Sequence, residues 1–220
     1  AAAEPAPTAA PAEPAPGAAP APADPCGDAA ITLVHLQYTP SGRVAAATTA
    51  DAPASSPAAA ALTEAINALR TAQDADTVAC ALLIYVSSFC ERAIFFNVRK
   101  GALRSHDCTG KDIDVARLKE LSISGEEPSV FRDVMAGRYP YRGAPGESAA
   151  IEALAAVMPP PLGDVVVLPI AVRHRVVSVV YGDRLMTELT EAGMTRVALE
   201  AGIAYERVIA SRKESTTKSA

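Results

Sequence analysis

Three groups of residues carry side chains that could take part in chemistry. An Arg-His-Arg sequence at residues 173–175 divides two valine-rich runs, and such a basic centre could meet a phosphate or a metal ion. A His-Asp-Cys sequence stands at residues 106–108. The cysteines are Cys26, Cys80, Cys90 and Cys108. Each group has to be tested against the element that would position it.

The first two groups fail that test. Residues 173–175 fall at the predicted tip of a hairpin, where polar residues are required and three basic groups stay in water. Phosphate capture would need a helix N-terminus beside them, and none is predicted there. Residues 106–108 are adjacent on a predicted strand and point to opposite faces, so they cannot converge on a metal ion. We therefore expect an exposed turn, a polar strand end and no metal site.

The cysteines do not indicate catalysis either. None forms a C-x-x-C pair, and Cys80 and Cys90 lie in an apolar helical pattern, where a thiolate is disfavoured. Buried, reduced thiols are the expectation. No Ser-His-Asp order or carboxylate pair stands out, and Asp183 alone is expected to cap a helix that begins at Leu185. The sequence predicts no catalytic residue and no cofactor.

Composition narrows the classes of partner. The chain has 220 residues, a net charge of −5 and a pI of about 5.3, so neither nucleic acid nor an anionic membrane is an expected partner. The longest apolar run, residues 78–89, is too short to cross a bilayer. Because the chain begins with Ala and shows no signal peptide, we expect a piece of a longer cytoplasmic protein.

The chain divides by composition. Residues 1–28 are mostly Ala and Pro, typical of a disordered, semi-stiff linker that tethers an upstream module. Residues 29–56 predict a short hairpin or irregular connector. Residues 57–213 predict the folded domain, and 214–220 a disordered tail.

Within the domain, helices and hairpins alternate. Ser56-Pro57 predicts a helix start, and Asp74 or Asp76 can cap a second helix over residues 78–89. A hairpin is expected at 92–108, a short helix from Pro128 to Gly137, another before the prolines at 159–161, a second hairpin at 165–183, and a long helix from Leu185 to about Lys213. This order predicts an α+β fold whose mostly antiparallel sheet has helices packed on one side.

Three stretches give this order a family resemblance. Two helices run into "RAIFFNVRKGAL", a short helix ends before an extended x-P-x in "SVFRDVMAGRYPYRG", and Leu-Pro precedes the turn in "VVLPIAVRHRVVSVVYGDR". The chain from about Pro57 to Lys213 resembles a GAF domain, a relative of the PAS sensory domains, in the style of multidomain proteins of GC-rich bacteria such as myxobacteria. Arg173-His174 stands where the family often has Gly, and the family's cyclic-nucleotide and bilin motifs are not visible.

The resemblance implies a non-catalytic sensory or regulatory domain. It places a small-molecule ligand between the sheet and residues 109–163, where the candidates are Phe131, Tyr139, Tyr141 and Arg142. The alternative is a ligand-free module for dimerisation or protein–protein interaction. The candidates for a homodimer through the terminal helices are Leu62, Ile66, Leu69, Leu185, Leu189 and Tyr205. Packing of these residues within their own domain remains the competing interpretation.

Overall fold

The computed structural model describes residues 56–160 and 162–218. The predicted linker at 1–28 and nearly all of the predicted connector at 29–56 lie outside these residues. The described chain forms six helices and six strands in α+β order, which confirms the predicted fold class. No helix in the described ranges combines the length and apolar character that a bilayer span needs.

The first two helices begin where the sequence predicts. Ser56 accepts a bond from the Ala59 N–H at the start of α1 (Pro57–Thr71). Of the two capping candidates, Asp74 is the one used, and it accepts from the Thr77 N–H at the start of α2 (Ala75–Ser87). Each cap satisfies one of the N–H groups that a helix start leaves without a partner.

The sheet is antiparallel throughout, in the order β3-β2-β1-β6-β5-β4. The two predicted hairpins are confirmed and supply its centre: β1 (Cys90–Arg99) with β2 (Ala102–Gly110), and β5 (Val165–Val172) with β6 (Arg175–Leu185). Strands β1 and β6 pair directly and join the two hairpins. Short strands, β3 (Ser122–Ser124) and β4 (Tyr141–Gly143), form the two edges.

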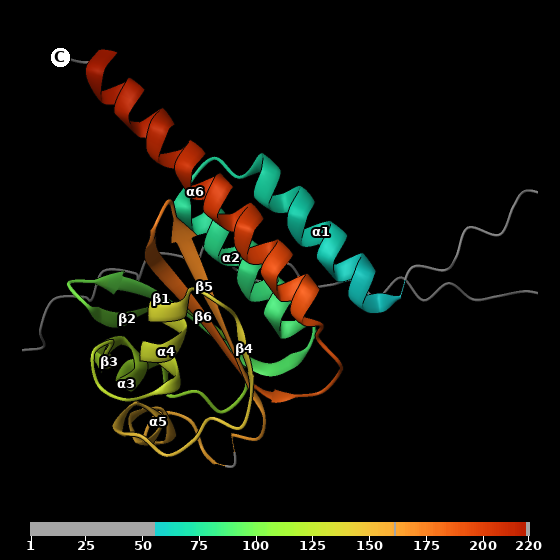
Figure 1. The fold of residues 1–220 in the computed structure, drawn as a ribbon, viewed down its shortest axis with the longest axis vertical. Helices are drawn as coiled ribbons and strands as arrows, with labels where there is room; N and C mark the ends of the chain where they lie inside the picture. The colour runs from blue at the N-terminus through green and yellow to red at the C-terminus, as the bar shows by residue number, and fades with distance from the viewer. Residues whose placement is uncertain (1–55, 161, 219–220) are drawn as a thin grey trace, which may run out of the picture. The chain divides into compact units, whose positions relative to one another are not determined.

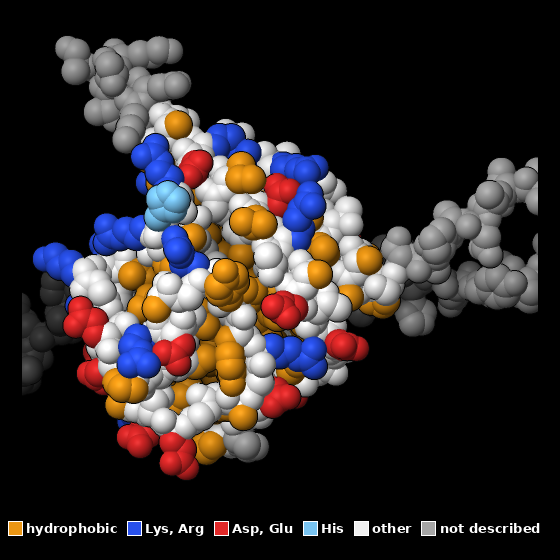
Figure 2. Space-filling view, viewed as in Figure 1, with side chains coloured by type: hydrophobic (Ala, Val, Ile, Leu, Met, Phe, Trp, Pro, Cys, Tyr) orange, Lys and Arg blue, Asp and Glu red, His pale blue; other side chains and the backbone are white. Residues whose placement is uncertain are grey.

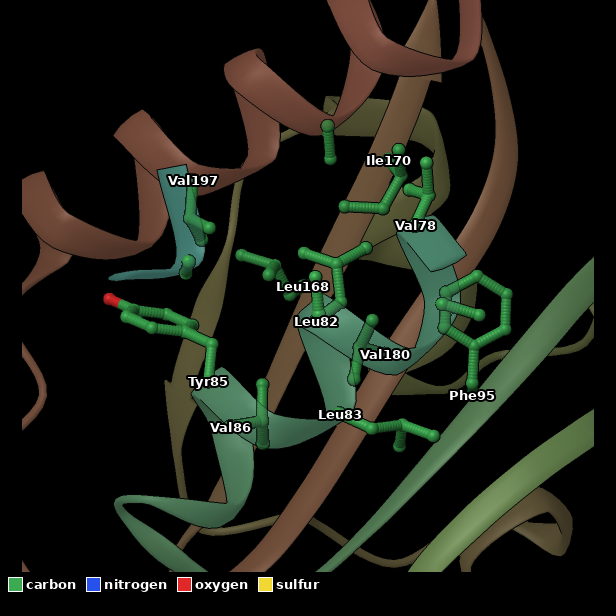
Figure 3. Close-up of a cluster of buried hydrophobic side chains, with 14 of the residues drawn as sticks. Val78, Leu82, Leu83, Tyr85, Val86, Phe95, Leu168, Ile170, Val180 and Val197 are labelled. Carbon is green, nitrogen blue, oxygen red and sulfur yellow. The ribbon is translucent and has the colours of Figure 1, made fainter. Parts of the chain in front are cut away.

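One face of the sheet is covered by the three longer helices (Figure 1). Helices α2 and α6 (Glu191–Lys218) lie on the strands, and α1 packs against both helices. Figure 3 shows how apolar side chains fill the space between them. Val78 and Leu82 of α2 meet Leu168 and Val180 of the sheet, and all four are fully buried. This cluster is called the helix-side core below.

The other face is covered by the connection between the hairpins. It contains α3 (Val115–Glu120), α4 (Val130–Gly137) and α5 (Ala149–Ala155). Their apolar side chains pack on alternate residues of the central strands, such as Ile94 and Val179. This second cluster is called the connection-side core. Because both faces are covered, β5 and β6 are buried at most positions on both faces, as the sequence predicts.

One expectation about helix ends is confirmed and one is wrong. Helix α4 ends at Gly137 as predicted, and Arg138 after it adopts the left-handed conformation with a φ of 60°. Asp183 does not cap the last helix, because it lies on β6 with its side chain buried. Thr190 takes that role, since its Oγ1 accepts from the Gly193 N–H.

The last helix therefore begins later than predicted. Leu185 ends β6 opposite Cys90, and Leu189 lies in the loop before α6, so neither residue is helical. The helix also continues to Lys218, past the boundary at 213 that the sequence predicts. The extended "VVYGDRL" stretch pairs with β1 as far as Leu185 opposite Cys90, and this pairing prevents an earlier helix start.

Close packing of α6 on β5 generates a first prediction. A Cβ added to Gly202 would lie 2.4 Å from the Ala171 carbonyl oxygen, which is closer than backbone atoms allow. We expect Gly202→Ala to lower the free energy of unfolding by about 1–2 kcal/mol, although alanine favours a helix by about 1 kcal/mol. Urea unfolding measures the difference.

Gly137→Ala in α4 is the matched control. Its added Cβ would meet no atom nearer than 3.5 Å, so stability should stay unchanged or rise slightly. Equal responses of the two variants would contradict the close approach of α6 to the sheet.

Candidate functional site

A charged pair lies inside the connection-side core. Arg92 of β1 donates from Nε to Asp183 Oδ1 over 2.8 Å and from Nη2 to Asp183 Oδ2 over 2.6 Å. The two side chains are 1% and 0% exposed. The strands place them together because Arg92 and Asp183 are directly opposite in the β1–β6 ladder. Such a bidentate pair fixes both the distance and the orientation of the two strands.

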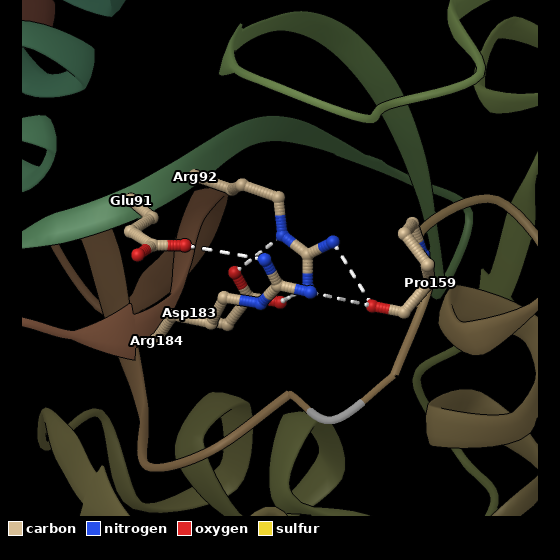
Figure 4. Close-up of polar contacts among 5 residues, drawn as sticks. All are labelled: Glu91, Arg92, Pro159, Asp183 and Arg184. Atoms are coloured by element: carbon tan, nitrogen blue, oxygen red, sulfur yellow. Dashed lines mark hydrogen bonds and ion pairs between the residues drawn. The ribbon is translucent and has the colours of Figure 1, made fainter.

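The pair also holds the chain that leads into β5. Arg92 Nη1 donates to the Pro159 carbonyl over 3.1 Å, and Arg184 Nη2 donates to the same oxygen over 3.1 Å. Arg184 in turn pairs with Glu91 at 3.2 Å (Figure 4). Two arginines from the sheet thus meet one carbonyl at the end of the 109–163 connection. This contact closes the connection over the sheet.

A second polar group lies on the same face without a partner. By donor–acceptor distance and angle, the Tyr181 hydroxyl is the one buried side-chain nitrogen or oxygen in the described chain that lacks a hydrogen bond, although the Asp183 carboxylate lies near enough to raise its pKa. Its ring packs against Phe131, with ring centroids 5.8 Å apart. A buried hydroxyl without a partner costs about 1–3 kcal/mol, so it marks either a strained core or a place for a ligand.

Burial governs the electrostatics of this region. It raises the pKa of Asp183, and the bonds from Arg92 act in the opposite direction. Burial, followed by the charge of Asp183, also raises the pKa of Tyr181, which keeps its hydroxyl protonated. Both oxygens of the Asp183 carboxylate accept from Arg92, and the Tyr181 hydroxyl keeps its proton. The arrangement can therefore donate and accept hydrogen bonds, and its carboxylate is engaged by Arg92.

The four predicted ligand residues do not converge. Phe131 is fully buried between Phe96 and Tyr181 and serves the core. Tyr141 is half-buried, and its hydroxyl donates to the Ala144 carbonyl. Arg142 is exposed and donates to the Leu189 carbonyl over 3.1 Å, while Tyr139 is 73% exposed. Their role in ligand binding stays a prediction.

The space proposed for a ligand is occupied by side chains of the connection-side core. Shallow depressions open to solvent lie elsewhere. One, of about 620 Å³, runs along α6 and includes Arg196 and Leu199. Another, of about 470 Å³, lies between Arg142 and the loop after β6. A small molecule on the connection side would therefore have to displace part of this core.

The other chemistry-bearing groups remain apart. Cys90 packs in the helix-side core, whereas Cys108 borders the connection-side core across the sheet. His106 of β2 contacts Asp76 of α2, with 3.0 Å between His106 Nε2 and Asp76 Oδ1. Within the described ranges, no cluster of three or more His, Cys, Asp or Glu residues could hold a metal ion.

Sequence reasoning missed the Arg92–Asp183 pair. A signal was present, since Arg92 is a charge inside a strand and Asp183 is a charge at the end of another strand. A buried charge requires a partner, and these two residues have opposite signs. The pairing became visible only with the β1–β6 register, which joins residues far apart in the sequence.

The chain matches no family model and no curated protein sequence. Solved structures are similar to it, among them a GAF domain of a phosphoenolpyruvate-protein phosphotransferase from Coxiella burnetii. That structure is 9% identical with a TM-score of 0.56, and the match covers 74% of this chain and 99% of that one.

A phycoerythrobilin-bound GAF domain from a cyanobacterial phytochrome is also similar. It is 11% identical with a TM-score of 0.55, covering 71% of this chain and 98% of that one. The free methionine-R-sulfoxide reductase from Neisseria meningitidis is 13% identical with a TM-score of 0.52, covering 69% and 89%. At these identities the likeness establishes the fold. The described chain has the GAF fold, as the resemblance implies.

The buried ion pair generates a second prediction. Arg92→Met leaves the Asp183 carboxylate buried without its partner, so we expect the free energy of unfolding to fall by about 3–5 kcal/mol. Replacing both residues, Arg92→Met with Asp183→Leu, should recover most of that loss, because no charge is then buried. Urea unfolding of the two single variants and the double variant gives the coupling free energy. Simple addition of the two single losses would contradict this account.

A third prediction concerns pH. Burial, together with the charge of Asp183, raises the pKa of Cys90 from 9.0 to about 12, and burial raises the pKa of Tyr85 from 10.0 to about 12. The unfolded chain loses these protons at lower pH than the folded chain. The contribution of these two groups to the free energy of unfolding should therefore be constant below about pH 9 and fall between about pH 9 and 12.

The fall amounts to about 1.4 kcal/mol for each unit of difference in pKa. Denaturant unfolding at a series of pH values measures it. Cys90→Ala should make the first part of the fall shallower, and Tyr85→Phe the later part. A profile that neither substitution alters would show that these groups do not carry the effect.

Proposed function

We propose that this domain, which has the GAF fold, is a non-catalytic sensory or regulatory domain of a bacterial signalling protein in the cytoplasm. Its target would be a further module of the same polypeptide, in keeping with the linker predicted at residues 1–28. The observation that carries the proposal is the arrangement of α6. The same helix lies on the sheet, packs against α1 and continues to Lys218.

Helix α6 is firmly attached to the rest of the domain. Val197, Ala201 and Val208 are buried in the helix-side core. Arg207 reaches across to α1 and donates to the Leu69 carbonyl over 2.7 Å and to the Ala72 carbonyl over 3.3 Å. These carbonyls are at the C-terminal end of α1, where a cation is favourable. A change in the sheet or in α1 would therefore move α6, which supports a regulatory output through this helix.

The outer face of α6 supports self-association. Leu199 and Ile203 are 62% and 58% exposed and lie one turn apart on the helix. The residues that the sequence predicts for a dimer contribute less to such a surface. Three of them are buried in their own domain, namely Leu69, Leu189 and Tyr205. The others are half-buried, namely Leu62, Ile66 and Leu185. A homodimer through α6 thus remains a proposal, with Leu199 and Ile203 as its apolar centre.

Besides self-association through α6, the domain could be regulated by binding a small molecule. The Tyr181 hydroxyl, buried without a partner, supports it, because a ligand with a polar atom could satisfy this group. The Phe131 ring beside it would have to move. A ligand-free interaction module is the alternative, supported by the filled connection-side core.

The non-catalytic part of the proposal is supported by the cysteines. The fold also occurs in a methionine-R-sulfoxide reductase, so the fold itself does not decide the question. Here the thiol of Cys90 is buried with a raised pKa, which disfavours the reactive thiolate. Cys108 lies on the opposite side of the sheet from Cys90, so the two thiols do not face one shared substrate position.

A fourth prediction separates the modes. Native mass spectrometry of the protein purified from cells should show a dimer, and Leu199→Glu with Ile203→Glu should convert it to a monomer with an unchanged far-ultraviolet circular dichroism spectrum. Met186→Glu, at another exposed apolar residue, should leave the dimer intact and is the matched control. A dimer that survives both α6 substitutions would contradict assembly through this face.

The same spectra test the ligand. A bound small molecule that disappears in Tyr181→Phe supports sensing on the connection side. If no molecule is bound, Tyr181→Phe should raise stability by removing an unpaired hydroxyl. That result would support the ligand-free module instead.

A further inference from the structure

Basic side chains gather at one end of the sheet. The β1–β2 turn, the β5–β6 turn and the end of α4 meet there, because β1 and β6 are antiparallel neighbours with Asn97 opposite Ser178. Figure 2 shows blue side chains around a histidine near the tip of the β5–β6 hairpin. The group called the basic tip consists of Lys100, Arg138, Arg173, His174 and Arg175, all of them exposed.

Three residues of the basic tip have a strained, left-handed backbone conformation. Lys100, Arg138 and Arg173 have φ angles of 52°, 60° and 58°. This left-handed region suits glycine, and a residue with a Cβ pays for it in conformational free energy. Each of the three stands at a turn or helix end where glycine is the usual choice. A cationic residue therefore adopts the left-handed conformation at three positions at one end of the sheet.

One carboxylate, that of Glu126, lies beside the β1–β2 turn, where its Oε1 is 3.4 Å from the position that a Cβ on Gly101 would take. Arg138 Nη1 contacts the His174 carbonyl at 3.4 Å, which draws the end of α4 toward the hairpin turn. The ion pairs of the described chain involve other side chains, and none includes a residue of the basic tip. Backbone strain of this kind occurs most often at functional sites.

We propose that the basic tip is a docking surface for an acidic segment of a partner protein. Charge complementarity supports an anionic occupant. The adjoining side chain is Tyr139, which is 73% exposed. Tyrosine and arginine together are the residues most enriched at protein–protein contacts that carry binding energy.

A protein segment fits better than a nucleic acid or a membrane. The basic tip is confined to two turns and one helix end, whereas nucleic acid needs a longer stripe of cations. The whole chain carries a net charge of −5, which repels long polyanions and anionic membranes at a distance. A short acidic segment makes contact with the basic tip alone.

The test uses the full chain and a fluorescein-labelled peptide rich in glutamate, with the glutamine version of that peptide as a blank. Fluorescence anisotropy should show binding of the glutamate peptide that weakens with added salt. Arg173→Gly should weaken binding roughly two- to fivefold, and Arg173→Gly with Arg175→Ala about tenfold. At the same time Arg173→Gly should raise the midpoint of urea unfolding, because glycine relieves the left-handed strain.

Two controls at the opposite end of the sheet separate charge from strain. Lys111→Ala removes an exposed cation there, and Asp112→Gly relieves a φ of 58° there. Lys111→Ala should leave peptide affinity unchanged, and Asp112→Gly should raise the unfolding midpoint without weakening binding. No binding of the glutamate peptide, or equal weakening by Lys111→Ala, overturns the proposal. So does tighter binding of a DNA oligonucleotide or of phosphatidylserine vesicles, if Arg173→Gly weakens it.

Discussion

Coverage of the sheet on both faces is the constraint on which the rest of this structure depends. Strands β1, β5 and β6 carry apolar residues on both faces of the sheet, so neither face can be left in water. Three long helices cover one side, and the connection between the hairpins must cover the other. That requirement gives the 109–163 connection its short helices. It also explains why glycines such as Gly202 stand where a helix meets the sheet most closely.

The buried ion pair is a consequence of the same constraint. Once the connection covers the sheet, any charge on that face must find a partner or lose its charge. Arg92 and Asp183 meet this condition through the register of β1 and β6, and Arg92 has a donor left for the Pro159 carbonyl. The pair contributes little net stability compared with apolar residues of the same size. It does specify one arrangement of the strands and one position for the end of the connection.

The sequence is sufficient to predict the helices and strands, and it is insufficient to predict which of their residues contact one another. Ser56, Asp74 and the two hairpins follow from local chemistry, since caps and turns depend on residues a few positions apart. The partnership of Arg92 with Asp183 spans the whole domain and needs the strand register. The error at Leu185 has the same origin. Its apolar pattern fits a helix or a strand equally well, and only pairing with Cys90 decides between them.

The candidate site shows the same difference between what the sequence predicts and what only tertiary packing decides. The resemblance to GAF domains led to Phe131 and Tyr141 as ligand contacts, but sequence spacing cannot say whether an aromatic residue lines a cavity or fills it. Phe131 fills it, because Phe96 and Tyr181 pack on its two sides. The interior is therefore committed to packing, with the Tyr181 hydroxyl as its one unpaired buried side-chain group in the described chain. Side chains free to meet other molecules are on the outside, along α6 and at the turns. A contact on this surface requires no repacking of the two cores, whereas a ligand in the interior would have to displace packed side chains.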